Sequence, residues 1–185
     1  NSNHKYLLKI VVSMIPAVLI GLFFEKEIEL FFTGNISLVG SMLIITGILL
    51  LLTKMSKETK RDISYLHSLI IGISQAFAMI PGISRSGATI CTSLLLGNKK
   101  NETAKFSFLM VIPLIFGKII KDLFSSNVIF NNIDYSIYIF GFLSAFITGL
   151  FACKLMLKIV KNNSLIIFSG YCIIVGVLSI IISSY

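Results

Sequence analysis

The segment Pro81–Thr89 contains the residue types that bind an anion. It reads Pro-Gly-Ile-Ser-Arg-Ser-Gly-Ala-Thr, which places one arginine among three hydroxyl side chains. A guanidinium group is a planar set of N–H donors that matches the oxygens of a phosphate. A helix that begins just after Pro81-Gly82 would add free backbone N–H groups and the positive end of its dipole. The segment therefore predicts a site for phosphate or diphosphate.

The smaller residues of the segment have roles within that prediction. Ser84 or Ser86 could cap the helix, and Ser86 and Thr89 are three residues apart, on one helix face. Gly82 and Gly87 permit close approach of backbone or ligand. Serine, threonine and glycine also pack membrane helices together, so without the arginine they would favour a structural interpretation.

Two further features have competing interpretations. Gln75 precedes Arg85 by ten residues and could reach the site, but a packing hydrogen bond is an equally good interpretation. Gly141, Ala145 and Gly149 recur every four residues and predict a helix-packing face.

The composition is that of a membrane protein. Of the 185 residues, 56% are hydrophobic and 13% are charged, whereas soluble domains have about 25% charged residues. The apolar segments lack the polar face of a soluble helix, and the short alternating strands of a β-barrel are absent. The net charge of +8 comes from basic residues at segment ends, which favours membrane topology and anionic lipids over nucleic acid as the explanation.

Seven apolar runs follow one another in a single domain, residues 1–185. They are Leu7–Phe24, Ile36–Thr53, Ile63–Ile80, Ser86–Gly97, Phe106–Ile120, Ile137–Ile159 and Leu165–Ser183. Twelve helical residues rise about 18 Å, which is too short for a hydrocarbon core of about 30 Å. The sequence therefore predicts an all-α polytopic membrane protein with five transmembrane helices and one re-entrant helix pair, residues 63–97, which turns at Pro81-Gly82.

The basic residues support this topology. With a re-entrant pair, the N-terminal side has twelve lysines and arginines: Lys5, Lys9, Lys54, Lys57, Lys60, Arg61, Lys99, Lys100, Lys105, Lys154, Lys158 and Lys161. The other side has three: Lys26, Lys118 and Lys121. The positive-inside rule then predicts a cytoplasmic N-terminal side, with the turn at Arg85 pointing outward.

The run Gln75–Thr89 resembles the second signature of bacterial undecaprenyl-diphosphate phosphatases, the bacitracin-resistance family. The runs Glu102–Pro113 and Ile15–Glu25 are also similar to that family, and the likeness covers essentially the whole chain. The resemblance implies an enzyme of the bacterial inner membrane that removes one phosphate from the C55 isoprenoid diphosphate and so recycles the lipid carrier of peptidoglycan synthesis.

The resemblance also implies site residues, a cofactor and a repeat. Ser84, Arg85 and Thr89 would be catalytic, and a divalent cation, Mg²⁺ or Ca²⁺, would take part. Gly82, Ser86, Gly87 and Gln75 would contact the substrate. The fold would consist of two inverted repeats, with residues 7–62 as the last two crossings of the first and residues 63–185 as the second.

The chain departs from the family in one respect. The family's first signature, rich in glutamate and followed by Pro-x-Ser-Ser-x-Gly-His, has no counterpart here. We therefore expect an N-terminally truncated chain that is inactive alone, with no identifiable metal ligands. Phosphate release by the purified chain would contradict that expectation. Two alternatives stay open: a lipid-phosphate flippase that uses the same pocket, and a structural membrane subunit. A homodimer also stays open.

Overall fold

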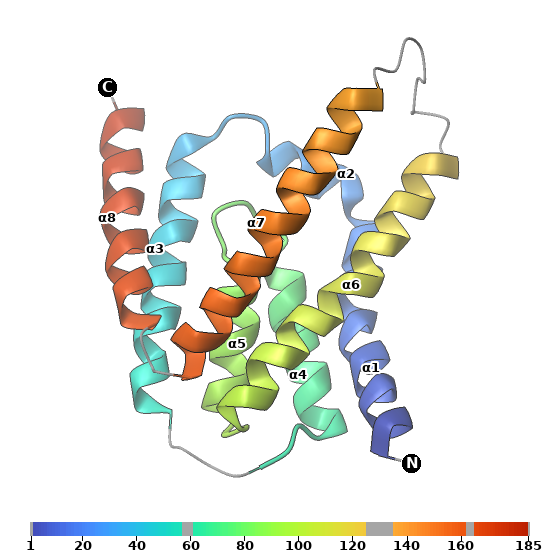
Figure 1. Cartoon of the computed structure of the whole chain (residues 1–185). Helices are drawn as coiled ribbons and strands as arrows, with labels where there is room; N and C mark the ends of the chain where they lie inside the picture. The colour runs from blue at the N-terminus through green and yellow to red at the C-terminus, as the bar shows by residue number, and fades with distance from the viewer. Residues whose placement is uncertain (1, 57–60, 125–134, 162–164, 185) are drawn as a thin grey trace.

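The computed structural model of the chain describes residues 2–56, 61–124, 135–161 and 165–184, which form α-helices and no β-strand. The helices are α1 (Ser2–Phe23), α2 (Glu25–Phe31), α3 (Ile36–Leu52), α4 (Tyr65–Phe77), α5 (Arg85–Leu95), α6 (Lys100–Phe124), α7 (Tyr135–Lys161) and α8 (Leu165–Ser183) (Figure 1). Five of them, α1, α3, α6, α7 and α8, are long and apolar enough to cross a membrane. The prediction of an all-α polytopic membrane protein with five spans is confirmed.

Helices α4 and α5 form a short antiparallel hairpin inside the bundle. They have 13 and 11 residues, which correspond to lengths of about 20 and 17 Å. In Figure 1, α4 begins and α5 ends at the end of the bundle where the N-terminus lies, and the turn between them lies part-way along the neighbouring α3. This is the shape expected of a re-entrant pair, and its entry into a membrane stays a prediction.

A network of buried polar side chains fixes the base of the hairpin. His67 Nδ1 on α4 lies 2.8 Å from Asn98 Oδ1, and Asn98 Nδ2 donates to Ser93 Oγ at 3.1 Å. Ser93 Oγ is in turn 2.8 Å from Thr103 Oγ1 on α6. Since Asn98, Ser93 and Thr103 are each at most 3% exposed, these bonds satisfy groups that would be costly to bury unpaired. The network joins α4, α5 and α6 at one end.

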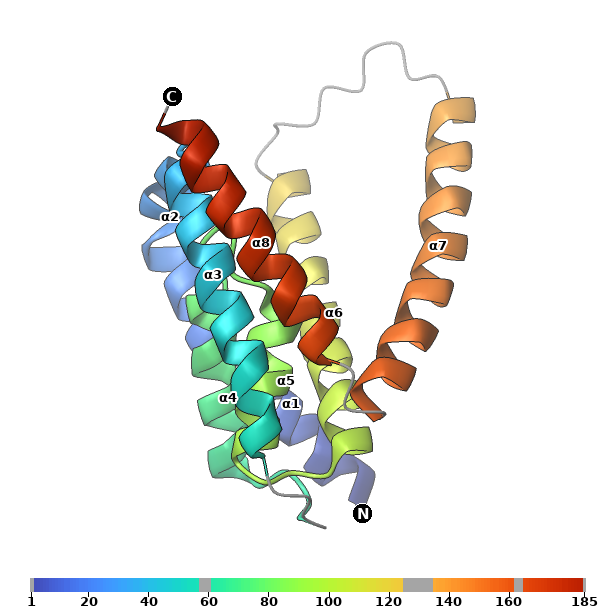
Figure 2. The same ribbon diagram turned by 90° about the vertical axis from the view of Figure 1, so that its left-hand side faces the viewer.

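The most extensive helix pair joins α3 to α8, far apart in the sequence (Figure 2). Glycines allow the two backbones to approach closely. A Cβ at Gly40 would lie 2.8 Å from the Gly176 carbonyl oxygen, and one at Gly176 would lie 2.7 Å from that of Gly40. Ser169 Oγ donates to the Gly47 carbonyl oxygen at 2.6 Å. Small residues and one interhelical hydrogen bond are the usual means by which membrane helices associate.

Helices α1 and α4 cross at a second close contact. A Cβ at Gly72 would lie only 2.2 Å from the Ser13 carbonyl oxygen, so the crossing requires glycine there. The adjacent core contains Ile71, Phe106 and Met110, each at most 1% exposed. Because α6 contributes Phe106 and Met110, this core fixes α6 against the hairpin and α1.

Two helices begin well before the predicted runs, and one further helix lies between two of those runs. Residues Glu25–Phe31, between the first two predicted runs, form the separate helix α2. Helix α6 begins at Lys100, six residues before the predicted run Phe106–Ile120, and α1 begins at Ser2, five residues before the run Leu7–Phe24. Charged residues are good helix formers at membrane ends, because their side chains reach water while the backbone stays helical.

The predicted packing face of α7 is wrong for the residues described. A Cβ at Gly141 or Gly149 would have nothing within 4 Å, and the most apolar part of α7 buries none of its residues. The glycines that do bring helices together lie on α3, α4 and α8.

The distribution of basic residues follows the two ends of the bundle. Of the twelve assigned to the N-terminal side, Lys57 and Lys60 lie outside the described residues. The other ten are on segments near the end with the N-terminus, whereas α2 and the C-terminal part of α6, with Lys26, Lys118 and Lys121, lie toward the opposite end (Figure 1).

Candidate active site

The turn between α4 and α5 has a conformation that only glycine adopts readily. Gly82 has φ +94°, in the region where a side chain is strained. A Cβ at Gly82 would also lie 2.5 Å from the Val39 carbonyl oxygen and 2.8 Å from Met42 Cβ. Gly82 therefore permits a close approach, as predicted, and it is the backbone of α3 that lies against it.

Thr46 on α3 fixes this turn from the side. Its Oγ1 lies 3.1 Å from the Gly82 carbonyl oxygen and accepts a hydrogen bond from the Ser84 N–H at 3.1 Å. The Thr46 side chain is 1% exposed. No local pattern in the sequence indicates this role, because Thr46 lies 36 residues before Gly82 in a largely apolar run.

Of the two predicted candidates, Ser84 and Ser86, Ser84 is the N-cap of α5. Its Oγ accepts a hydrogen bond from the Gly87 N–H at 3.1 Å, and its carbonyl oxygen accepts one from the Ala88 N–H at 2.8 Å. Gly87 packs tightly against this cap, since a Cβ there would lie 3.0 Å from Ser84 Oγ. Within the described residues, the N–H groups of Arg85 and Ser86 have no acceptor. The first turn of α5 thus keeps two donors for a ligand or water.

Thr89 has a hydroxyl that serves helix packing. Thr89 Oγ1 lies 2.6 Å from Ser107 Oγ on α6 and 2.9 Å from the Arg85 carbonyl oxygen. It is 1% exposed and does not line the cavity described next. Ser86 is half-buried and does not line that cavity either.

A cavity of about 740 Å³ lies beside the turn, between α1, α2, the hairpin and α6. Most of its wall is apolar, contributed by α1 from Met14 to Leu22 and by α6 from Pro113 to Ile119. Its polar lining is small and largely charged: Glu25, Glu29, Gln75, Arg85, Lys118 and Lys121. An apolar wall with a few polar groups is typical of a small-molecule site.

Arg85 and Gln75 are the two predicted residues that the fold brings into this cavity. The Arg85 side chain is exposed and forms no ion pair or hydrogen bond with any residue described. Gln75 is 1% exposed, and neither its Nε2 nor its Oε1 has a hydrogen-bond partner among the residues described. A buried amide without hydrogen bonds is rare and destabilising, which favours a ligand-binding role over the alternative of a packing hydrogen bond.

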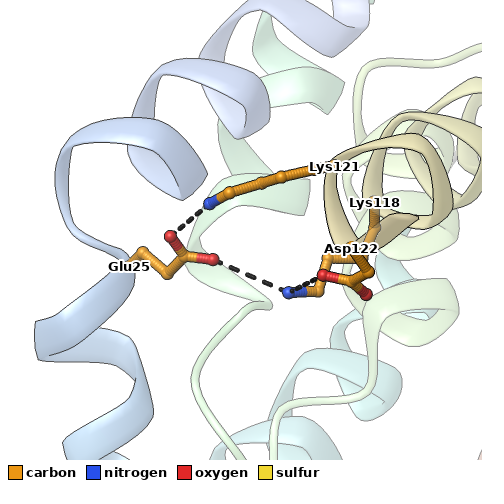
Figure 3. Close-up of polar contacts among 4 residues, drawn as sticks. All are labelled: Glu25, Lys118, Lys121 and Asp122. Atoms are coloured by element: carbon orange, nitrogen blue, oxygen red, sulfur yellow. Dashed lines mark hydrogen bonds and ion pairs between the residues drawn. The ribbon is translucent and has the colours of Figure 1, made fainter. Parts of the chain in front are cut away.

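Glu25 connects the end of α1 to α6 across the cavity wall (Figure 3). Its carboxylate accepts a hydrogen bond from Lys121 Nζ and lies 3.6 Å from Lys118 Nζ, which also pairs with Asp122 at 3.0 Å. The Lys121 hydrogen bond and the charges of both lysines hold the pKa of the Glu25 carboxyl below its usual value. This group was not predicted from the sequence, although Lys118 and Lys121 are one turn apart and hence on one helix face.

A divalent cation would find few ready ligands among the described residues. They contain no group of three or more histidine, cysteine, aspartate or glutamate side chains that could hold a metal ion. The Glu25 carboxylate is already bound by two lysines. Magnesium is usually bound through one or two carboxylates together with substrate phosphates. The cavity lining has two carboxylates, Glu25 and Glu29, and the implied cation stays a prediction.

Comparison with known proteins agrees with this architecture. The family model described as bacitracin resistance protein BacA matches residues 1–178. A protein of Christiangramia forsetii named undecaprenyl-diphosphatase is 53% identical over 98% of this chain and 69% of its own length. Proteins of the same name from Bacteroides fragilis and Methanococcus vannielii are 44% and 43% identical, over 99% and 92% of this chain and 70% and 68% of theirs. The chain belongs to the BacA family of bacitracin resistance proteins.

Proposed function

We propose that this protein is an undecaprenyl-diphosphatase, which hydrolyses the C55 isoprenoid diphosphate to the monophosphate. The observation that carries the proposal is the cavity beside the hairpin turn, where Arg85 and the unpaired amide of Gln75 meet a long apolar wall. The shared name of its relatives supports the same activity.

The apolar wall fits the lipid part of such a substrate. Met14, Val18 and Leu22 of α1 face the cavity together with Leu114 and Ile115 of α6. Lipid tails are as apolar as leucine side chains, so a lipid chain can move from the bilayer to this wall without entering a polar environment. Isoprene units next to the diphosphate would therefore bind along α1 and α6, and the rest of the chain would stay in the lipid.

The charged lining fits the diphosphate. Arg85 would bind phosphate oxygens with its fork of donors, close to the free N–H groups of the first turn of α5. The Gln75 amide would donate from Nε2. Lys118 and Lys121 would add positive charge, and a phosphate would compete with Glu25 for them.

The proposed reaction is attack of water on the terminal phosphorus. A bond forms between the water oxygen and that phosphorus, and the bridging P–O bond breaks. The products are lipid monophosphate and inorganic phosphate; one proton of the water stays on the phosphate and the other is released. Arg85 would stabilise the charge on the equatorial oxygens, the main contribution that a protein makes to phosphoryl transfer.

The proposed location is the bacterial inner membrane, with the end that holds the N-terminus in the cytoplasm. The excess of lysine and arginine at that end supports this orientation. Glu25 and Lys121, at the cavity wall, would then lie toward the outer face, and the hairpin α4–α5 would be re-entrant. We also propose that residues 63–185 form one of two inverted repeats.

The alternative function, a flippase for a phosphorylated lipid, would use the same cavity. Broken helices that meet at a turn are a transporter feature as well. The name of the relatives favours the hydrolase. The two functions are separable in sealed vesicles, because a flippase moves labelled lipid across the bilayer without releasing phosphate.

Arg85→Ala tests the proposal. We expect phosphate release to fall by about 10²- to 10³-fold, and binding of a non-hydrolysable isoprenoid thiodiphosphate to weaken. Arg85→Lys keeps the charge but loses the fork, and we expect it to recover only part of the activity. Arg61→Ala, at the only other arginine of the chain, is the matched control. Unchanged turnover and binding in Arg85→Ala, at several substrate concentrations in detergent, would refute the role of Arg85.

A further inference from the structure

A second cavity lies at the opposite end of α6 from the Glu25 ion pairs. It has a volume of about 460 Å³ and lies between the first turns of α6 and the last turns of α7. Figures 1 and 2 both show these two segments side by side at the end with the N-terminus. We call it the basic cavity and define it by its lining: Lys100, Asn101, Ala104, Lys105, Leu157, Lys158 and Lys161.

The basic cavity brings four lysines together, and none of its lining residues is acidic. Within the described residues, Lys105 and Lys158 take part in no ion pair. Glu102, the acidic residue of the same turn of α6, interacts electrostatically with Tyr6 and Lys99 instead. Like charges from two helices that face one cavity repel each other, so an anion between them would be stabilising.

The packing around the cavity shows that it is a fixed feature of the fold. Ala104 of α6 and Val160 of α7 are each 1% exposed and belong to one hydrophobic cluster with Leu94 and Leu165. This cluster holds the two helices together directly beside the lysines. Lys158 and Lys161 also favour the C-terminal end of α7 through the helix dipole, but that role does not require Lys100 and Lys105 on the facing helix.

The surroundings indicate a lipid as the source of the anion. Leu157 lines the cavity, and Leu109 and Ile112, further along α6, are 41% and 45% exposed. In a membrane these side chains contact acyl chains. Basic pockets between membrane helices on the cytoplasmic side are a known setting for anionic lipid head groups. We propose that the basic cavity binds the phosphate head group of an anionic phospholipid, with its acyl chains along α6 and α7.

The test measures lipid bound to the purified protein in nanodiscs of phosphatidylcholine with roughly one tenth phosphatidylglycerol or cardiolipin, by native mass spectrometry. Each lysine near an anionic surface contributes about a fivefold factor in affinity. We expect Lys105→Gln/Lys158→Gln to retain roughly 10- to 30-fold less anionic lipid. The matched control is Lys5→Gln/Lys54→Gln, which removes two exposed lysines near the same end but outside the cavity, and we expect it to behave as the unsubstituted protein.

Three outcomes would overturn the proposal. Equal retention by both double variants would assign the effect to overall charge. Unchanged retention in Lys105→Gln/Lys158→Gln would exclude the cavity as the site. Displacement of the lipid by millimolar inorganic phosphate would indicate a site for free phosphate. The melting temperature of each variant in detergent checks that the fold is kept, and the readout is independent of phosphatase activity.

Discussion

Gln75 and Arg85 differ in how deeply the protein buries their polar groups. The arginine is exposed at the start of α5, whereas the glutamine is buried on α4, where neither polar atom has a partner in the part of the chain that the structure describes. A polar group buried without a partner costs about 1 to 3 kcal/mol. The protein keeps this group at the wall of the cavity, where a bound diphosphate would supply the missing partner.

This arrangement predicts opposite effects of Gln75→Met on stability and on function. Methionine has a similar length and no amide to desolvate, so we expect the melting temperature of the ligand-free protein to stay equal or rise. The affinity for an isoprenoid thiodiphosphate should fall by about tenfold, which corresponds to the loss of one hydrogen bond to a charged group.

Thermal melting in detergent and ligand titration measure the two effects separately. Ser74→Ala, at the preceding position of α4, removes a hydroxyl that donates to the Ile71 carbonyl oxygen and serves as the control. A lower melting temperature with unchanged affinity in Gln75→Met would show that Gln75 is a packing residue.

The residues of the site could be predicted from the sequence only where their chemistry is local. Ser84 caps α5 by accepting a hydrogen bond from the N–H of Gly87, three residues later, and this spacing is visible in the sequence. Thr89 binds Ser107, which is 18 residues away on α6, and Thr46 binds a turn 36 residues away. Such partners depend on how the helices pack, and no spacing in the sequence indicates that.

At the scale of elements, the apolar runs predicted the helices to within a few residues, because hydrocarbon thickness sets their length. The same signal could not find α2, which has seven residues and two glutamates in its first turn. It also could not predict which helices pair. Helices α3 and α8 are apolar on every side, so the glycines at their contact are not distinguished by sequence from Gly141 and Gly149 on α7.

The Glu25 ion pairs join α6 to the start of α2, and they predict a dependence of stability on pH. Because Lys121 and Lys118 lower the pKa of Glu25 in the folded protein, the pairs stabilise it above the usual glutamate pKa of about 4.3. The stabilisation is lost as the pH falls below that value through the lowered pKa. We expect Glu25→Gln to reduce the melting temperature at neutral pH. The difference from the unsubstituted protein should shrink as the pH falls below about 4.3 and disappear below the lowered pKa of Glu25.

Glu27→Gln is the matched control for this prediction. Glu27 lies on the same helix but takes part in no ion pair with the residues described. Melting curves in detergent from roughly pH 3 to 8 compare the three proteins. The same pH profile for both variants would mean that the Glu25 pairs contribute nothing specific.

At the scale of the whole molecule, the two ends of the bundle carry different charge. The end with the N-terminus has most of the basic residues, and the other end has Lys26, Lys118 and Lys121. The alternation of helices between these ends follows from the hairpin, because α4 and α5 return the chain to the end where α4 begins. The positions of lysine and arginine in the sequence had predicted at which end of the bundle each helix begins.

The proposed orientation predicts the labelling of single cysteines. With Cys91, Cys153 and Cys172 replaced by serine, we expect Lys26→Cys to react with a membrane-impermeant maleimide in intact spheroplasts. Lys54→Cys should react only after the membrane is permeabilised. The two sites are matched, since each replaces a lysine at a helix end. The reverse pattern would place the Glu25 ion pairs on the cytoplasmic side.

The pairing of α3 with α8 has a consequence for biosynthesis. The hydrogen bond from Ser169 to Gly47 joins residues 122 positions apart. At a synthesis rate of roughly 5 to 20 residues per second, α3 waits roughly 6 to 24 s in the membrane before α8 has been made. During that time the glycine surface of α3 faces lipid or the insertion machinery. The order of translation therefore places the formation of the most extensive helix contact last, after the hairpin and its turn have been synthesised.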